Sequence, residues 1–151
     1  MRPRERDGVD YHFLTPQEFE RRVAAGDFLE HVTYAGNRYG TLRSEIDRIL
    51  AAGRCPIVEI ELAGARAVRA MIPDAVSIFI SPPSLEELVA RLGRRGTDSE
   101  AEIAARMETS RVELQARDEF DHTVINDDRE RAIADLAHVV RDAVQAQPAD
   151  A

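Results

Sequence analysis

The residues around Glu30 have the side-chain types that bind a small anionic ligand. Asp10-Tyr11 precedes Glu30, and the run Gly36-Asn37-Arg38-Tyr39-Gly40-Thr41 follows it. A carboxylate, two phenols and a hydroxyl near tight turns suit the edge of a base and one phosphate. Glu30 would accept from a pair of purine N–H groups, and Tyr11, Tyr39 and Arg2 would donate to phosphate oxygens. An antiparallel subdomain with a polar outer face explains the same residues equally well.

A second candidate is the pair Glu59 and Glu61, two residues apart in the apolar run Pro56–Glu61. On a strand this spacing points both carboxylates to one face. The run is expected to be a buried strand, whose carboxyl end is where α/β folds bind ligands. Buried carboxylates are normally paired or liganded, so these two could accept from a purine or hold a hydrated Mg²⁺. A salt bridge to Arg66 or Arg69 is the structural alternative.

A third candidate is the arginine-rich run Arg91-Leu92-Gly93-Arg94-Arg95-Gly96-Thr97, with Arg106 further along. Glycines flanking arginines between two expected helices indicate a mobile lid whose guanidinium groups close over phosphates. A guanidinium group that neutralises developing charge accelerates phosphoryl transfer strongly. A solvated basic helix end, favourable beside the helix dipole, is the simpler interpretation of these residues taken alone.

Composition limits the remaining function classes. The chain has 151 residues and 20 basic side chains, all of them arginine, so it contains neither a lysine nor the G-x-x-x-x-G-K-[ST] phosphate loop. Its net charge of −8 argues against a non-specific grip on nucleic acid or on an anionic membrane. A lone Cys55, no secretory signal and no long apolar stretch predict a cytoplasmic protein. The four histidines show no metal-ligand spacing.

The elements that must position these residues begin with a mixed region. Residues 11–14 are expected to form a short strand. Thr15, Pro16 and Glu18 predict a helix start with a capping box, and Gly26 predicts its end. Residues 28–34 and 38–41 are expected to be strands around the turn at residues 35–37. A helix over residues 42–52 should end at Gly53.

The pattern changes after Cys55. Residues 56–61 and 76–80 are expected to be parallel strands joined by a helix over residues 63–71. Pro82-Pro83-Ser84 should cap a helix over residues 85–94, and Ser99 with Glu102 should cap a helix that reaches about residue 116. Residues 122–125 are expected to form a last strand, and a final helix should start near Asp127 and Glu130. This order predicts an α/β fold with a parallel sheet.

Taken together, the three candidate clusters resemble the guanylate kinase family in order and spacing. The matching segments cover nearly the whole chain: Asp7-Gly8-Val9-Asp10-Tyr11-His12-Phe13, Phe28-Leu29-Glu30, Gly36–Thr41, Pro82-Pro83-Ser84, Gly96-Thr97-Asp98-Ser99 and Val124-Ile125-Asn126-Asp127-Asp128. The resemblance implies transfer of the ATP γ-phosphoryl group to GMP with Mg²⁺. It also implies a P-loop kinase-like parallel-sheet core, a small mixed α+β GMP-binding subdomain and a helical lid.

The resemblance assigns roles to individual residues. Arg2, Tyr11 and Tyr39 resemble the binders of the GMP phosphate. Glu30, Thr41 and Glu61 resemble the guanine readers, with Glu59 beside them near the metal and phosphates, as a possible outer-shell contact of Mg²⁺. Arg91, Arg95 and Arg106 resemble the catalytic, ATP-gripping arginines of the lid, and Asn126 resembles a residue beside the adenine. The expected division is residues 1–53 for GMP, residues 54–90 and 107–147 for the core, residues 91–106 for the lid and residues 148–151 as a disordered tail.

Two departures from the family pattern affect these expectations. Glu61 stands where aspartate is usual, and its extra methylene would displace its contact with guanine. The family also begins with a strand, a glycine-rich loop containing lysine, a helix and a Thr-Thr-Arg-x-x-Arg segment, and Met1-Arg2-Pro3 resembles only the end of that segment. We therefore expect a truncated chain with a gap in its sheet, marginal folding and little activity of its own.

Two hypotheses follow from the resemblance. In the first, the chain is part of a guanylate kinase, a monomer or homodimer that acts on GMP and ATP. In the second, it is a non-catalytic guanylate-kinase-like module that binds a phosphorylated or acidic protein ligand. The ATP-side arginines favour the first hypothesis, because a peptide-binding module has no evident use for them.

Overall fold

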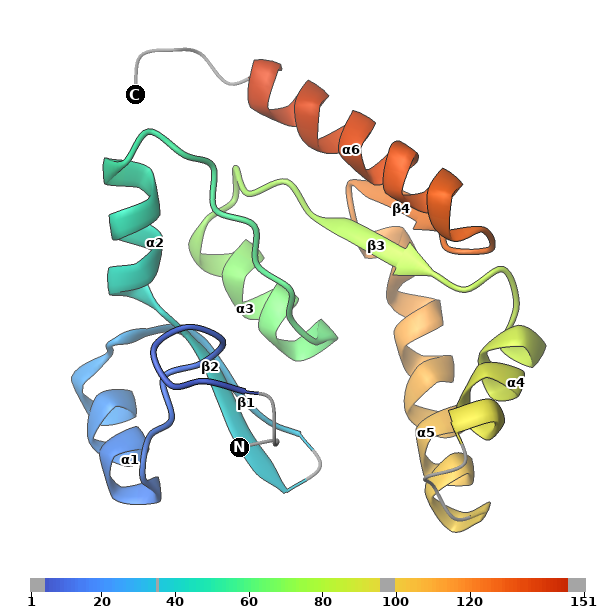
Figure 1. The fold of residues 1–151 in the computed structure, drawn as a ribbon, viewed down its shortest axis with the longest axis horizontal. Helices are drawn as coiled ribbons and strands as arrows, with labels where there is room; N and C mark the ends of the chain where they lie inside the picture. Colours follow the sequence, from blue (N-terminus) through green and yellow to red (C-terminus); the bar gives the residue numbers. More distant parts are fainter. Residues whose placement is uncertain (1–4, 35, 96–99, 147–151) are drawn as a thin grey trace. The chain divides into compact units, whose positions relative to one another are not determined.

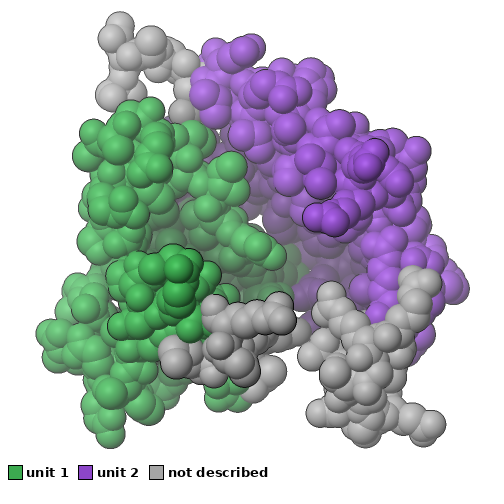
Figure 2. Space-filling model, viewed as in Figure 1, with its two compact units in different colours: residues 1–68 green, residues 69–151 purple. Residues whose placement is uncertain are grey.

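The computed structural model describes residues 5–34, 36–95 and 100–146, without the side chains of residue 34 and residues 92–106. Two compact units divide the chain, residues 1–68 and residues 69–151 (Figure 2). The elements run in the order α1 (Pro16–Ala25), β1 (Phe28–Tyr34), β2 (Asn37–Leu42), α2 (Arg43–Ala51), α3 (Leu62–Met71), β3 (Ile78–Ser81), α4 (Leu85–Arg95), α5 (Glu100–Gln115), η1 (Ala116–Glu119), β4 (His122–Ile125) and α6 (Arg129–Ala146) (Figure 1).

Helix α1 begins and ends where the sequence predicts. The Thr15 hydroxyl oxygen accepts from the Glu18 backbone N–H at 3.2 Å, Pro16 opens the helix, and Gly26 ends it in the left-handed region at φ 73°. The expected capping box is only half present. The Glu18 carboxylate binds the guanidinium groups of Arg21 and Arg22, because two cations one turn away compete with the backbone N–H group for it.

Strands β1 and β2 form the predicted antiparallel hairpin, with one irregularity. Phe28 pairs with Leu42, but Glu30 pairs with Thr41, so β1 contains one extra residue at Leu29. Such a bulge interrupts the alternation of faces. The Phe28 and His31 rings therefore lie together, 6.1 Å apart, and both contact Phe19 of α1. Glu30 is left to face the opposite side with Thr41.

A glycine makes the packed face of the hairpin possible. A Cβ atom at Gly40 would lie 2.8 Å from the Phe28 ring and 2.9 Å from the Glu30 carbonyl oxygen, closer than real Cβ contacts allow. Phe19, Phe28 and Leu29 are buried and form the core of this unit. The hairpin passes directly into α2, which ends as predicted at Ala52 and Gly53.

The expected strand over residues 11–14 is wrong. The segment before α1 folds back on itself instead, with a single bridge between Asp7 and Tyr11 and a turn at Gly8, whose φ is 71°. The Asp7 carboxylate accepts from the Phe13 N–H at 2.8 Å. Because that donor is occupied by a side chain of the same segment, it is not offered to a neighbouring strand.

In the second unit β3 and β4 pair in parallel, from Ile78 opposite His122 to Ser81 opposite Ile125. A side-chain clamp closes the start of the pair. The Asp121 carboxylate accepts from the Ser77 N–H at 2.8 Å and from the Ser77 hydroxyl at 2.6 Å. Hydrogen bonds from the Ser77 hydroxyl, and then from its N–H, lower the pKa of Asp121.

The expected strand over residues 56–61 is also wrong, since none of the described strands pairs with this segment. Its residues still alternate between half-buried and exposed, as an extended chain does, and Ile57 is 75% exposed. The apolar sequence gives the extended backbone, but a strand also needs a partner for its N–H and C=O groups. The next predicted strand is real but begins two residues later, at Ile78.

Three helices complete the second unit. The Ser84 hydroxyl accepts from the Glu87 N–H at 3.2 Å, which confirms the predicted cap of α4. Helix α6 begins at Arg129, within the predicted start near Asp127 and Glu130, and the Asp128 carboxylate caps it by accepting from the Arg131 N–H at 2.9 Å. The predicted cap of α5 at Ser99 lies outside the described residues, as does the tail at residues 148–151. Among the described residues, no helix has the length and apolar content needed to cross a membrane.

Candidate functional site

The bulge in β1 creates a buried carboxylate with one unused oxygen. Glu30 is only 5% exposed, and its Oε1 atom accepts from the Thr41 hydroxyl at 2.7 Å. No donor in the described part of the chain reaches its buried Oε2 atom. An unsatisfied buried acceptor lowers stability unless a ligand supplies the missing donor. Two of the residues predicted to read a base therefore lie together, on the face of the hairpin that points away from α1.

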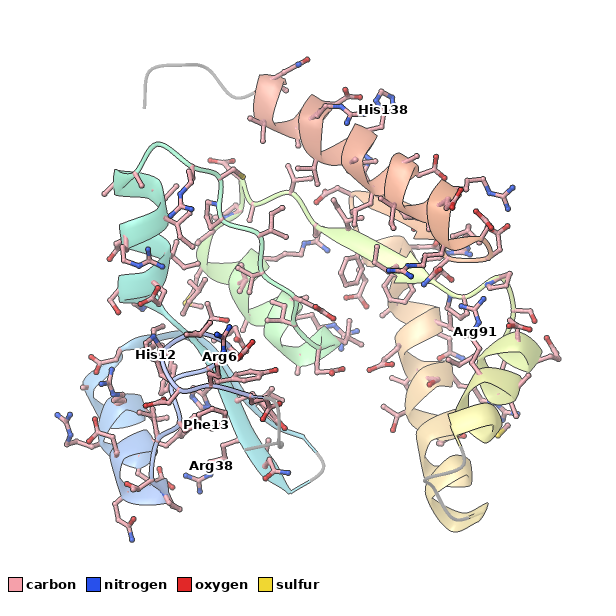
Figure 3. The ribbon with its side chains drawn as sticks, in the orientation of Figure 1. Arg6, His12, Phe13, Arg38, Arg91 and His138 are labelled. Atoms are coloured by element: carbon pink, nitrogen blue, oxygen red, sulfur yellow. The ribbon has the colours of Figure 1, made fainter. Side chains whose placement is uncertain are left out.

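The two predicted phosphate-binding tyrosines also lie together. The rings of Tyr11 and Tyr39 meet edge to face at 6.3 Å, and Tyr11 also contacts Phe13, which Figure 3 labels. Tyr39 and Thr41 are two residues apart on β2 and so share a face of the hairpin. Tyr11 is 49% exposed and Tyr39 is 39% exposed. Their hydroxyl groups are therefore accessible to a ligand close to the buried Glu30–Thr41 pair.

Glu59 and Glu61 differ from their prediction. Both are exposed, so the expected burial of their carboxylates is wrong. The expected common face is supported, because Ile57, Glu59 and Glu61 are exposed while the residues between them are half-buried. The Glu61 carbonyl oxygen accepts from the Ala65 N–H, so this pair leads directly into α3.

One contact in this unit was missed by sequence reasoning. Gly64 is buried in the first turn of α3, and a Cβ atom there would lie 2.8 Å from Glu30 Oε2. The sequence signal is a glycine inside a segment that otherwise has a good helical pattern, where glycine usually has a packing reason. The bulge at Leu29, which determines where Glu30 points, has no such signal.

A hollow of about 320 Å³ lies elsewhere in the first unit, among the loop before α1, α1 and the start of α2. Its lining includes Asp7, His12, Arg22 and Glu45, but neither Glu30 nor the two tyrosines. His12 lies 3.5 Å from the Glu45 carboxylate across it. We locate the candidate site at Glu30 rather than in this hollow, because each of these charged groups already has a partner. Asp7 accepts from the Phe13 N–H group, Arg22 donates to Glu18, and Glu45 contacts both Arg48 and His12.

In the second unit two of the predicted ATP-side residues are in direct contact. The Arg91 guanidinium group donates to the Asn126 carbonyl oxygen at 2.8 Å and to the Glu87 carboxylate at 2.8 Å; Figure 3 labels Arg91 on α4. Asn126 directly follows β4, and its N–H donates to the Ser81 carbonyl oxygen at 2.7 Å. The contact therefore lies at the carboxyl ends of two parallel strands, where α/β folds bind ligands.

Several predicted site features fall outside the description. Arg2 is not among the described residues, and the side chains of Arg95 and Arg106 are not described. The described residues contain no group of three or more His, Cys, Asp or Glu side chains that could hold a metal ion.

The strongest pKa shift lies away from the site. Hydrogen bonds from Arg21, and then from Arg22, lower the pKa of Glu18 from 4.5 to about 2.

Comparison with known proteins relates nearly the whole chain to one family. The sequence model described as guanylate kinase matches residues 1–143. The chain belongs to the guanylate kinase family. A guanylate kinase of Synechococcus sp. (strain JA-3-3Ab) is 50% identical over 135 residues, which are 89% of this chain and 62% of that protein. A guanylate kinase of Leifsonia xyli subsp. xyli (strain CTCB07) is 49% identical over 149 residues, which are 98% of this chain and 57% of that protein.

A solved guanylate kinase structure gives the same result for the fold. The crystal structure of guanylate kinase from Anaplasma phagocytophilum matches with a TM-score of 0.79 and 30% identity, over 97% of this chain and 71% of that one. The predicted P-loop kinase-like α/β fold class is thereby confirmed. The relatives named here are all guanylate kinases, and they give no support to the alternative of a non-catalytic protein-binding module. The chain spans less than two thirds of the length of both curated relatives.

Proposed function

We propose that this guanylate kinase family chain takes part in the ATP-dependent phosphorylation of GMP, and that its first unit binds GMP. The main support is the buried Glu30 carboxylate, whose Oε1 atom is held by Thr41 and whose Oε2 atom has no donor among the described residues. Guanine offers two adjacent N–H donors on one edge, and a carboxylate with two oxygens matches that pair. Adenine offers no such pair, so the same group would select between the two purines.

The neighbouring residues take the remaining roles on the acceptor side. Tyr11 and Tyr39, whose rings meet at 6.3 Å, donate to the GMP phosphate together with Arg2. Glu61 approaches guanine beside Glu59, and its extra methylene relative to the usual aspartate alters that contact. The functional boundary of this subdomain after residue 53 is part of the proposal, whereas the contacts divide the chain after Val68.

On the donor side, Arg91, Arg95 and Arg106 grip ATP and neutralise the charge that develops on the transferred phosphoryl group. Asn126 lies beside the adenine. The core would comprise residues 54–90 and 107–147, and the lid residues 91–106. Arg91 now donates to Glu87 and Asn126, so it must exchange at least one of these acceptors for a phosphate oxygen.

Mg²⁺ enters the proposal only as the companion of ATP. The described residues contain no three-ligand group that could hold it. Glu59, which is exposed, is an outer-shell contact in this proposal. The proposal includes a cytoplasmic location and a monomer or homodimer, and the net charge of −8 disfavours binding to nucleic acid.

Calorimetric titration of the 151-residue chain with GMP and with AMP tests the acceptor site. We expect GMP to bind at least about tenfold more tightly, because the lone acceptor of Glu30 is satisfied only by guanine. Equal affinities would contradict the proposal. In a parallel assay, GMP-dependent release of ADP from ATP should be near background for these residues, since they include no lysine and no glycine-rich phosphate loop.

A further inference from the structure

Helix α3 approaches the Glu30 carboxylate through a residue that has no side chain. A Cβ atom built on Gly64 would lie 2.8 Å from Glu30 Oε2, 3.3 Å from Glu30 Cδ and 3.3 Å from Ile60 Cβ. Carbon–oxygen contacts of 2.8 Å at a Cβ atom are essentially never seen. A side chain at position 64 and the present carboxylate position therefore exclude each other.

Backbone geometry does not explain the glycine. Gly64 lies within a regular α-helix, and it is not among the glycines with positive φ. In such a position glycine is less favourable than alanine by roughly 1 kcal/mol. What glycine provides here is the space that Glu30 Oε2 occupies.

The carboxylate is thus held from two sides. Thr41 fixes Oε1 through a hydrogen bond of 2.7 Å, and the first turn of α3 lies against Oε2. The first N–H groups of a helix have no acceptors within the helix, and they carry partial positive charge. That charge favours a carboxylate beside the start of a helix, and the missing side chain of Gly64 leaves room for one.

We propose that Gly64 is a specificity-determining positioning residue, which keeps the Glu30 carboxylate where its two oxygens match the paired N–H donors of guanine. This inference rests on the proposed function. Adding a Cβ atom at position 64 displaces Oε2. The oxygen that receives the exocyclic amino group of guanine then moves, while the Oε1 atom bound to Thr41 moves less.

The test compares the affinities of GMP and IMP, because IMP lacks only the exocyclic amino group. We expect Gly64→Ala to weaken GMP binding about tenfold, the effect of losing one hydrogen bond to a charged group, and to leave IMP binding nearly unchanged. Ala67→Ser, which adds an atom at an exposed position of the same helix, should change neither affinity.

A second variant separates displacement of the carboxylate from general damage. Glu30→Asp shortens the side chain, so adding Gly64→Ala to it should cause no further loss of GMP-over-IMP selectivity. If Gly64→Ala does not fold, recovery of folding in the double variant supports the inference, and failure to recover overturns it. An unchanged GMP-to-IMP ratio in folded Gly64→Ala also overturns it. The proposed function itself fails at a different step, if the unmodified chain shows no preference for GMP over AMP.

Discussion

The key charged groups of the two units differ in whether their hydrogen-bonding atoms already have partners in the protein. In the first unit, no donor among the described residues reaches one oxygen of Glu30. In the second unit, Arg91 is occupied, since its guanidinium group donates both to a carboxylate and to a carbonyl oxygen of the protein. In the proposed function, the first group is organised for a ligand in advance, whereas the second must give up protein contacts to reach one. A group that is already positioned for its ligand binds that ligand more tightly. A residue on a segment that moves must be able to exchange one hydrogen-bond partner for another.

The two units also differ in how far apart in the sequence their contacting residues lie. The hairpin joins strands separated by a short turn, and Glu30 meets Thr41 eleven residues away. The parallel pair joins residues 44 apart, through the contact between Ser77 and Asp121. A local site can form as soon as its hairpin forms, while the second unit depends on long-range closure.

The largest effect should come from Glu30→Gln. An amide cannot accept two N–H donors, so GMP affinity should fall about 100-fold. Thermal stability should stay equal or rise, because a buried charged group with an unused oxygen is relieved. Calorimetry and thermal unfolding measure the two quantities, with the exposed Glu20→Gln as the control. A large loss of stability would mean that Glu30 serves the fold rather than a ligand.

A smaller effect is expected from Thr41→Val, which keeps the shape of the side chain but removes the donor to Glu30 Oε1. GMP affinity should fall about tenfold, because the carboxylate loses one of its two constraints. Thr33→Val is the matched control, since Thr33 is exposed on the same hairpin. Equal affinities of the two valine variants would show that the Thr41–Glu30 contact is not used in binding.

In the second unit, Arg91→Lys should lower the stability of the protein even in the absence of a ligand. An ammonium group retains the charge but does not reproduce the fork that reaches both Glu87 and Asn126. The free energy of unfolding should fall by about 1 kcal/mol, discounted because the Arg91 side chain is 33% exposed. Denaturant titration measures the change, and Arg111→Lys, whose carboxylate partner is 3.9 Å away, should have no effect. Unchanged stability in Arg91→Lys would remove the contrast with Glu30.

The smallest expected effects are losses of stability at low pH. The pKa values of Asp121 and Glu18 are both lowered, Asp121 by the bonds from Ser77 and Glu18, to about 2, by those from Arg21 and Arg22. A lowered carboxyl pKa contributes stability that is complete above the unfolded values near 4 and is lost as the pH falls through the folded value. We therefore expect the first unit to lose stability as the pH falls from about 4.5 to 2, and the second unit to lose stability as the pH falls below about 4.

Substitutions assign that acid dependence to the units. Asp121→Asn should flatten the pH dependence of unfolding in the second unit, and Glu18→Gln should flatten it less in the first, because exposed ion pairs contribute little. Thermal unfolding followed by NMR signals from each unit measures both. An acid transition that is unchanged in Asp121→Asn would show that the Ser77 clamp does not stabilise the parallel pair.

Helix limits were well predicted because local side chains determine them. Thr15 and Gly26 bound α1, and Ser84 caps α4, through contacts within a few residues of the helix end. The strands were predicted less well. Residues 56–61 have the composition of a buried strand but no partner among the described strands, and residues 11–14 lose a backbone donor to Asp7. Whether a strand forms depends on what lies beside it, and sequence patterns report that only indirectly.

The candidate site, like the fold, was predicted only in part from the sequence. The sequence alone determined which residue types are present, the order of the clusters and, through them, the family to which the chain belongs. Only the tertiary structure decided that Glu30 is buried with one oxygen free, that Gly64 provides the space for it, and that Glu59 and Glu61 are exposed. For Glu30, the physical reason is the extra residue at Leu29; for Glu59 and Glu61, it is that none of the described strands pairs with their segment. One inserted residue reverses the face of every side chain on one side of it, and only the pairing with β2 reveals that insertion.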